Sequence, residues 1–259
     1  MTDDQLSLGA GLAGRGVIVT GAASGIGRAT ARLAAACRAR VCGVDVNGPA
    51  LRSEMREWES PDRHLAIEID LTGAEAPRIV VDRVLEEFDD LWGLVHCAGI
   101  LIRRSSTAEI TREDWDVQHD LNLKAAFFLN QAVGEALKDR GGGGRMVTLS
   151  SQGWWTGGSH GSVVYSASKG GIVSMCRGLS TEYAPHGIMV NSIAPGVVDT
   201  PMLGVGLTSE DLVAIAASCP MGRLARPEEI ARVAVFLLST HASYVSAATI
   251  NVSGGLLFY

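Results

Sequence analysis

The chain has 259 residues, of which 47% are apolar and 19% charged, and its formal net charge is −6. This composition excludes a disordered chain, and the negative charge argues against a nucleic-acid or anionic-membrane surface. No apolar run reaches the roughly 20 residues of a membrane helix. The length accommodates one large α/β domain.

The cysteines indicate a reducing environment. They are scattered, without a CxxC pair or a Cys/His cluster at zinc spacing, so we expect reduced thiols and no metal site. Met1 to Gln5 is acidic and polar, unlike the basic and then apolar start of a secretory signal, so we expect a cytoplasmic protein. The five cysteines are Cys37, Cys42, Cys97, Cys176 and Cys219.

Strand and helix signals alternate along the chain. Short apolar runs predict strands at 17–19, 40–45, 65–70, 94–97, 146–149, 188–193 and 248–252. Helical patterns lie between them, at 27–38, 79–88, 112–138, 166–183, 209–217 and 227–238, and glycines 141–144 form a loop. This alternation predicts one doubly wound, Rossmann-like domain over residues 1–259, with a seven-stranded, mostly parallel sheet and a flexible terminus at 1–12.

A glycine-rich turn from Thr20 to Gly27 follows the first strand and opens the first helix. Glycines let the backbone approach a pyrophosphate, whose charge is favoured at a helix N-terminus. Asp45 ends the next strand about twenty residues on, where a carboxylate accepts hydrogen bonds from ribose hydroxyls. Because Asp45 would repel a 2′-phosphate and Val46 and Asn47 offer no cation, we predict NAD rather than NADP as the cofactor.

Several motifs in fixed order resemble the short-chain dehydrogenase/reductase family over nearly the whole chain. The TGxxxGxG spacing at Thr20–Gly27, the YxxxK spacing of Tyr165 and Lys169, and the Pro195–Thr200 segment carry the resemblance. It implies that the cofactor contacts Gly21, Ser24, Gly25, Ile26, Gly27, Asp45, Asp70, Leu71, Cys97, Ala98, Gly99, Tyr165, Lys169, Pro195, Gly196, Val198 and Thr200.

The same resemblance implies four catalytic positions: Ser151, Tyr165, Lys169 and Asn122. Tyr165 and Lys169 are four apart on a predicted helix and share one face, so the ammonium is expected to lower the pKa of the phenol. Tyr165 would transfer the proton of the alcohol, and Ser151 would hydrogen-bond the substrate oxygen. Lys169 would also hold the nicotinamide ribose, and Asn122 a water for proton relay.

Three features depart from the family pattern. His96 and Cys97 replace two asparagines, and we interpret His96 as a packed core residue rather than a catalytic one. Ser151 precedes Tyr165 by fourteen residues, one more than the family pattern, which leaves Ser150 as an alternative. Ser253 replaces a common aspartate, without an expected catalytic effect.

The substrate is expected over the nicotinamide, between the loop after Ser151 and the segment after Thr200. We expect Trp154, Trp155 and Met202 to contact it, although the two tryptophans suit a subunit interface or packing under the loop equally well. Arg103 and Arg104 are interpreted as a solvated pair. The substrate class is a secondary alcohol or ketone, cyclic or sugar-derived.

Two alternative functions and the state of assembly stay open. One is a 3-oxoacyl-thioester reductase that uses NADPH, and the other is a nucleotide-sensing module without catalysis. The resemblance also implies a homo-oligomer, a dimer or a tetramer, for which the apolar segments 125–128 and 256–259 are candidate interfaces.

Overall fold

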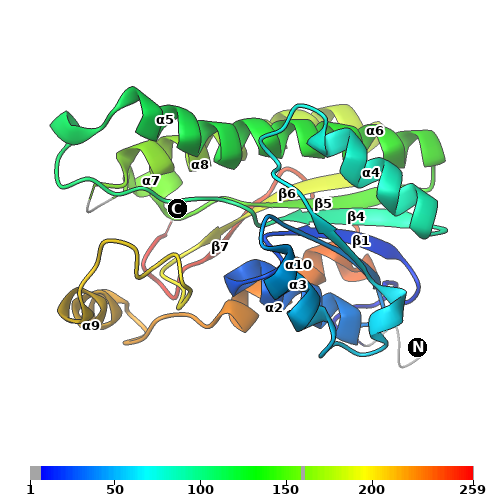
Figure 1. Cartoon of the computed structure of the whole chain (residues 1–259), viewed down its shortest axis with the longest axis horizontal. Helices are drawn as coiled ribbons and strands as arrows, with labels where there is room; N and C mark the ends of the chain where they lie inside the picture. Colours follow the sequence, from blue (N-terminus) through cyan, green and yellow to red (C-terminus); the bar gives the residue numbers. More distant parts are fainter. Residues whose placement is uncertain (1–6, 159–160, 259) are drawn as a thin grey trace.

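A single sheet of seven parallel strands organises the molecule in the computed structural model, which describes residues 7–158 and 161–258 (Figure 1). The strand order is β3-β2-β1-β4-β5-β6-β7, and every neighbouring pair is parallel, which confirms the predicted doubly wound fold. The strands are β1 (Gly16–Thr20), β2 (Arg40–Asp45), β3 (Leu65–Glu68), β4 (Leu91–His96), β5 (Gly144–Leu149), β6 (Ile188–Pro195) and β7 (Thr249–Val252).

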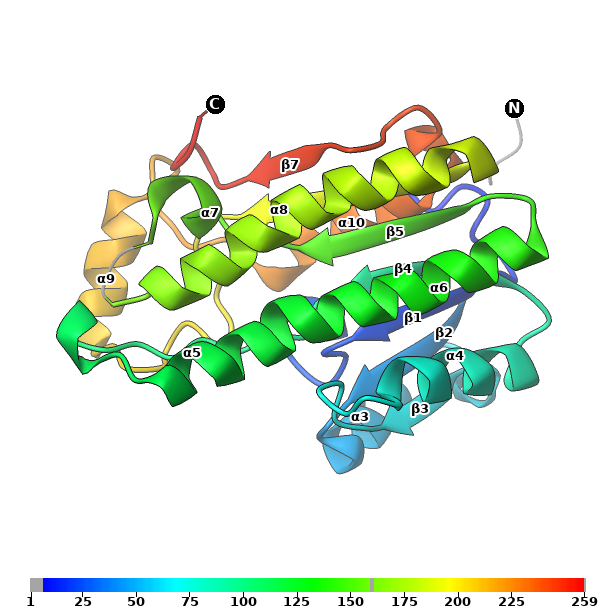
Figure 2. The same ribbon diagram turned by 90° about the horizontal axis from the view of Figure 1, so that it is seen from above.

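Helices cover both faces of the sheet (Figure 1). One face carries α2 (Gly25–Ala36), α3 (Gly48–Met55) and α10 (Pro227–Leu238), and the other carries α4 (Ala76–Glu87), α5 (Arg112–His119), α6 (Ala126–Arg140) and α8 (Val163–Tyr183). Two further helices, α7 (Gly153–Thr156) and α9 (Ser209–Ser218), lie beyond the carboxyl ends of the strands (Figure 2). Short turns of 3₁₀ helix occupy Pro61–Arg63, Thr107–Glu109, Ala184–His186 and Thr240–Ala242.

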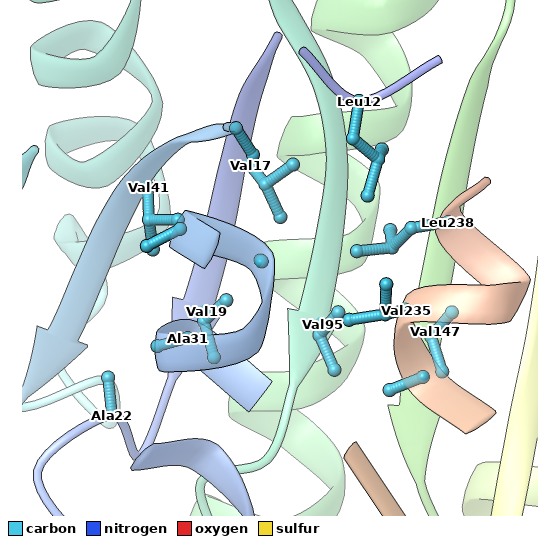
Figure 3. Packing of buried hydrophobic residues seen from close by; sticks show 14 of the residues in the cluster. Leu12, Val17, Val19, Ala22, Ala31, Val41, Val95, Val147, Val235 and Leu238 are labelled. Carbon is cyan, nitrogen blue, oxygen red and sulfur yellow. The ribbon is translucent and has the colours of Figure 1, made fainter. Parts of the chain in front are cut away.

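The core has two parts because successive residues of a strand face opposite sides of the sheet. In β1, Val17 and Val19 pack toward α2 and α10, whereas Ile18 packs toward the opposite helical layer. Figure 3 shows the first of these clusters, in which Val235 and Leu238 of α10 meet the strand side chains. Each such fully buried aliphatic side chain contributes about 1.5–3 kcal/mol.

Part of the N-terminal segment is packed rather than free. Residues 1–6 lie outside the described residues, but Leu12 is fully buried in the first core cluster. The amide of Thr240 donates a hydrogen bond of 3.0 Å to the carbonyl of Ala10. The expectation of a flexible terminus therefore fails for residues 7–12, because one isolated leucine gives no periodic pattern in the sequence yet fills a place in the core.

The long helix expected over 112–138 contains a π turn. Helix α5 ends at His119, residues Asp120–Ala125 form the π turn η3, and α6 continues to Arg140. A π turn requires one extra residue within a helix that otherwise keeps its direction, and apolar spacing does not reveal it. Across the described residues, no helix combines the length and the apolarity needed to span a membrane.

Candidate active site

Two adjoining cavities lie at the carboxyl edge of the sheet, where open α/β sheets bind ligands. One, of about 590 Å³, follows the ends of β1 and β2, and the other, of about 470 Å³, reaches the start of α8. Helices α7 and α9 flank this end of the molecule (Figure 2). The two cavities share the lining residues Ile26, Cys97, Gly99, Thr200 and Met202. They therefore form one continuous cleft.

The turn between β1 and α2 fits a pyrophosphate. Gly21 and Gly25 have φ values of +65° and +51°, which favour glycine. A Cβ at Gly27 would lie 2.1 Å from the carbonyl oxygen of Gly21, so only glycine fits there. Ser24 is the N-cap of α2, and its hydroxyl makes no capping hydrogen bond. The free N–H groups of the first turn of α2 thus adjoin a cavity lined at this turn mainly by glycine.

The far end of this cavity is acidic. The Asp45 carboxylate accepts hydrogen bonds from the amides of Ala23 at 3.0 Å and Asn47 at 2.9 Å, which fix it at the end of β2. Asp70 accepts from the amide and the hydroxyl of Thr72. The described residues that line this cavity include the carboxylates Asp45, Asp70 and Asp120, together with buried Leu71, and no lysine or arginine.

The hydroxyl of Thr20 connects β1 to the end of β4. It accepts hydrogen bonds from the amides of Cys97 at 3.1 Å and Ala98 at 3.0 Å, and lies 3.2 Å from Nδ1 of His96. With both lone pairs engaged, the hydroxyl donates its only hydrogen to Nδ1. His96 is therefore a neutral imidazole that carries its proton on Nε2.

His96 and Cys97, which replace two asparagines of the family pattern, have different environments. His96 is buried, as predicted for a core residue, and burial together with the Lys169 ammonium lowers its pKa to about 3. Its Nε2 is buried and has no hydrogen-bond partner among the described residues. Cys97 lines both cavities, and burial raises its thiol pKa to about 12, so the thiol stays protonated at neutral pH.

Ser151, Tyr165 and Lys169 meet at the start of α8 and line the second cavity. The Ser151 side chain is near enough to that of Tyr165 to lower the tyrosine pKa as a hydrogen-bond partner, and its hydroxyl accepts from the amide of Gly153 at 3.1 Å. Ser150, by contrast, is buried and donates a hydrogen bond of 2.8 Å to the carbonyl of Lys169. The structure thus places Ser151, rather than Ser150, beside the tyrosine.

The pKa of Tyr165 is not controlled by Lys169, contrary to what the sequence had led us to expect. Loss of hydration raises the pKa of Tyr165 to about 12, and the hydrogen bond from Ser151 and the positive charge of Arg103 oppose that rise. Lys169, expected to lower this pKa, has its Nζ 5.6 Å from the centre of the tyrosine ring and donates to the carbonyl of Leu149 at 2.8 Å. Burial lowers the Lys169 pKa to about 8, which leaves the ammonium mostly charged at neutral pH.

Asn122 lies in the π turn and is fully buried. Its Oδ1 accepts from the amide of Ile100 at 2.8 Å, and its Nδ2 donates to the carbonyl of Ile100 and the hydroxyl of Ser168. Both Nδ2 hydrogens are thus engaged. A relay water at this position can only donate to Asn122, through the remaining lone pair of Oδ1 or the main-chain carbonyl.

The two tryptophans predicted to contact the substrate are not among the described residues that line this cavity. Gly153 and Thr156, three apart on α7, do line it. Their rings contact each other at 5.3 Å, and Trp155 is 58% exposed. Met202, the third predicted contact, does line both cavities.

Arg103 and Arg104 are not the solvated pair that we expected. Arg104 forms a two-pronged ion pair with buried Asp114, with 2.8 Å between Nε and Oδ2. Arg103 is half-buried, lines the cavity with Tyr165, and donates through Nη1 to the carbonyls of Leu203 and Val205. Sequence alone does not separate the two neighbours, because only the course of the loop after β4 decides which way each one turns.

Ser166 lines the cavity although the sequence analysis did not single it out. Its hydroxyl is buried and makes no hydrogen bond among the described residues. The remaining predicted cofactor contacts Pro195, Gly196, Val198 and Thr200 line the same cleft. The described residues contain no group of three or more side chains able to hold a metal ion together.

Comparison with known proteins agrees with this geometry. A family model described as enoyl-(acyl carrier protein) reductase matches residues 21–257. The (3R)-3-hydroxyacyl-CoA dehydrogenase of Mus musculus is 34% identical, with 97% of this chain and 98% of the relative covered. The cis-4-hydroxycyclohexanecarboxylate dehydrogenase of Sinomonas cyclohexanicum is 36% identical, with 96% and 98% covered. The crystal structure of a short-chain dehydrogenase/reductase from Brucella melitensis, titled glucose/ribitol dehydrogenase, has a TM-score of 0.88 at 33% identity, with 96% and 98% covered.

The fold and the site together define a nicotinamide-nucleotide oxidoreductase that acts on hydroxyl or keto groups. The chain belongs to the short-chain dehydrogenase/reductase family.

Proposed function

We propose that this protein transfers a hydride between NAD(H) and a secondary alcohol or ketone. The observation that carries the proposal is the pair of Ser151 and Tyr165, which together line a cavity directly continuous with the nucleotide cleft. This pair supplies a proton-transfer group and a hydrogen-bond donor at one point, as the interconversion of an alcohol and a ketone requires.

The acidic end of the nucleotide cleft supports NAD over NADP. Asp45 is held by two main-chain amides with its carboxylate at the end of β2, where the adenosine ribose of a dinucleotide lies in this fold. A 2′-phosphate would meet Asp45 and, further along the cavity, Asp70, with no cation among the described lining residues. The two ribose hydroxyls would instead donate to Asp45.

In the proposed mechanism, bound NAD supplies the hydride acceptor. Ser151 donates a hydrogen bond to the substrate oxygen and holds it beside Tyr165. The Tyr165 phenolate removes the hydroxyl proton during oxidation, and the phenol returns it during reduction. Lys169 would hold the nicotinamide ribose through its positive charge, and Asn122 fixes the loop at Ile100, next to Gly99 and this lysine.

One alternative is reduction of a 3-oxoacyl thioester with NADPH. The similarity to a 3-hydroxyacyl-CoA dehydrogenase favours acyl thioesters as a substrate class to test. The acidic adenosine end opposes NADPH. The other alternative, a nucleotide-sensing module without catalysis, is opposed by the assembled Ser151, Tyr165 and Lys169 group.

We also propose a homo-oligomer in a reducing compartment such as the cytoplasm. Trp115 of α5 and Phe128 of α6 are 48% and 46% exposed, and Phe258 near the C-terminus is 85% exposed. Apolar surface of this kind favours association. Tyr259 lies outside the described residues. All five cysteines are free thiols, as a reducing compartment would keep them. Light scattering of the purified protein measures the state of assembly.

The test of the proposed function begins with calorimetric titration of NAD and NADP, followed by a screen for NADH formation with secondary alcohols. We expect NAD to bind more tightly and the Asp45→Asn variant to narrow the difference. A Tyr165→Phe variant should bind NAD normally and lose turnover by about 10²-fold or more. Binding of NAD without turnover of any alcohol would support the sensing module, and preference for NADP would refute the role of Asp45.

A further inference from the structure

Arg103 presents a guanidinium without a counter-ion to the substrate cavity. It lies on the loop that follows β4, and it is half-buried against the segment 200–207. Only Nη1 has hydrogen-bond partners among the described residues, the carbonyls of Leu203 and Val205, while Nε and Nη2 have none. A guanidinium offers five N–H donors, so most of its donors remain available.

The surroundings of Arg103 make its charge costly. The described lining of this cavity contains the two cations Arg103 and Lys169 and no aspartate or glutamate. Loss of hydration is the largest influence on the Arg103 pKa and lowers it. A half-buried cation without a counter-ion is unfavourable, whereas a carboxylate placed against it forms a paired, charge-assisted contact. The neighbouring Arg104, by contrast, has a counter-ion, because it forms an ion pair with Asp114.

Arg103 also lies on the correct side of the reacting group. Arg103 and Tyr165 both line this cavity, and the charge of Arg103 acts to lower the tyrosine pKa. A ligand that placed its hydroxyl at Tyr165 could therefore extend toward the arginine. The wall between them is largely apolar, with Leu101, Leu203 and Leu207 among its residues, and suits a short hydrocarbon or ring.

We propose that Arg103 binds a carboxylate of the substrate and that the protein acts on hydroxy acids or keto acids in which an apolar spacer separates the two groups. This inference rests on the proposed function and narrows its substrate class. The hydrogen bonds from Nη1 hold the guanidinium against the segment 200–207. Nε and Nη2 then face the carboxylate, and the hydroxyl of Ser166 is a further donor in the same cavity.

The experiment compares matched pairs of substrates that differ only in charge. The probes are 3-hydroxybutyrate, 4-hydroxypentanoate and 4-hydroxycyclohexanecarboxylate, each with its carboxamide, so that the distance between the hydroxyl and the charge varies. We expect the best acid to exceed its carboxamide in kcat/KM by on the order of ten- to a hundredfold. Arg103→Gln should reduce that ratio to within about threefold of one, and Arg103→Lys should restore part of it.

The ratio within a pair isolates substrate recognition from other roles of Arg103. Loss of its contacts to the segment 200–207, or of its effect on Tyr165, slows the acid and the carboxamide alike and leaves the ratio unchanged. The matched control is Arg112→Gln, which removes the same charge from an exposed position on α5 and should keep the wild-type ratio. Calorimetric NAD affinity shows that each variant is folded.

A second measurement does not depend on turnover. Cyclohexanecarboxylate and cyclohexanecarboxamide lack the reacting hydroxyl, and their binding in the presence of NAD is measured by calorimetry. Tighter binding of the acid by the wild type, abolished by Arg103→Gln, supports the proposal. Equal binding of the two, or a preference that survives in Arg103→Gln, overturns it. If the wild type turned over no alcohol at all, the proposed function would fail, and this binding preference would still decide the role of Arg103.

Discussion

Because His96 is buried as a neutral imidazole, we predict that the folded protein loses stability in mild acid. In the folded protein the hydroxyl of Thr20 donates to Nδ1, and burial together with Lys169 lowers the imidazole pKa from 6.5 to about 3. Protonation would remove the acceptor at Nδ1 and place a second cation near the ammonium. The folded state therefore keeps His96 neutral where the unfolded chain binds a proton.

The sign and size follow from linkage between proton binding and folding. A lowered folded-state pKa gives stability that is present above pH 6.5 and lost as the pH falls from 6.5 toward 3. Each pH unit in this window costs about 1.4 kcal/mol, so His96 removes about 2 kcal/mol at pH 5 relative to pH 8. Because the folded-state pKa lies far below pH 5, the unfolded-state pKa fixes the loss at that pH.

The assay is urea unfolding at pH 8 and pH 5 for the wild type and a His96→Asn variant. Carboxylates titrate in both proteins, so the difference between the two isolates the imidazole. We expect the wild type to lose about 2 kcal/mol more than the variant on going to pH 5. The same substitution at exposed His186 is the matched control. An equal loss in the wild type and His96→Asn would show that the folded state accepts the proton, and the assigned tautomer would be wrong.

Three further substitutions test the site. Ser151→Ala removes an interaction that lowers the Tyr165 pKa, so the pH at which the oxidation rate rises should increase. We also expect kcat to fall on the order of a hundredfold. An unchanged pH profile would contradict the interaction between Ser151 and Tyr165. Gly27→Ala places a Cβ 2.1 Å from the carbonyl oxygen of Gly21. Calorimetry should show that the affinity for NAD falls by at least about tenfold, while circular dichroism shows an unchanged fold. Trp155→Ala, at an exposed position outside the cavity, should leave kcat/KM within about twofold, and a larger loss would return the tryptophan to the substrate site.

The order of strands and helices was open to prediction because it depends on local patterns. The runs 40–45 and 227–238 became β2 and α10 within the predicted bounds. The π turn at Asp120–Ala125 and the single turn α7 were not predicted, since each is shorter than the repeat that apolar spacing can reveal. The packed segment around Leu12 was missed for the same reason.

Some residues of the candidate site could be predicted from local sequence, and others could not. Gly21, Gly27 and Asp45 lie in a local strand–turn–helix unit or directly after the next strand, so their positions follow from the sequence. The choice between Ser150 and Ser151 did not, because it depends on which hydroxyl faces α8 across the cavity. Gly153 and Thr156 line the cavity and the neighbouring Trp154 and Trp155 do not, a difference that depends on how α7 packs and that apolar spacing does not show.

The sequence by itself determined the doubly wound fold, the phosphate turn and the tyrosine–lysine spacing, since each depends on residues close together in the chain. Only the tertiary structure decided that Thr20 fixes the tautomer of His96, that Arg104 is neutralised by Asp114, and that Arg103 turns into the cavity. These outcomes depend on contacts between segments far apart in the sequence, or on the path of a loop between them. The free energy of a charge or a hydrogen bond depends on which partners and how much water surround it, and residue order does not specify either one.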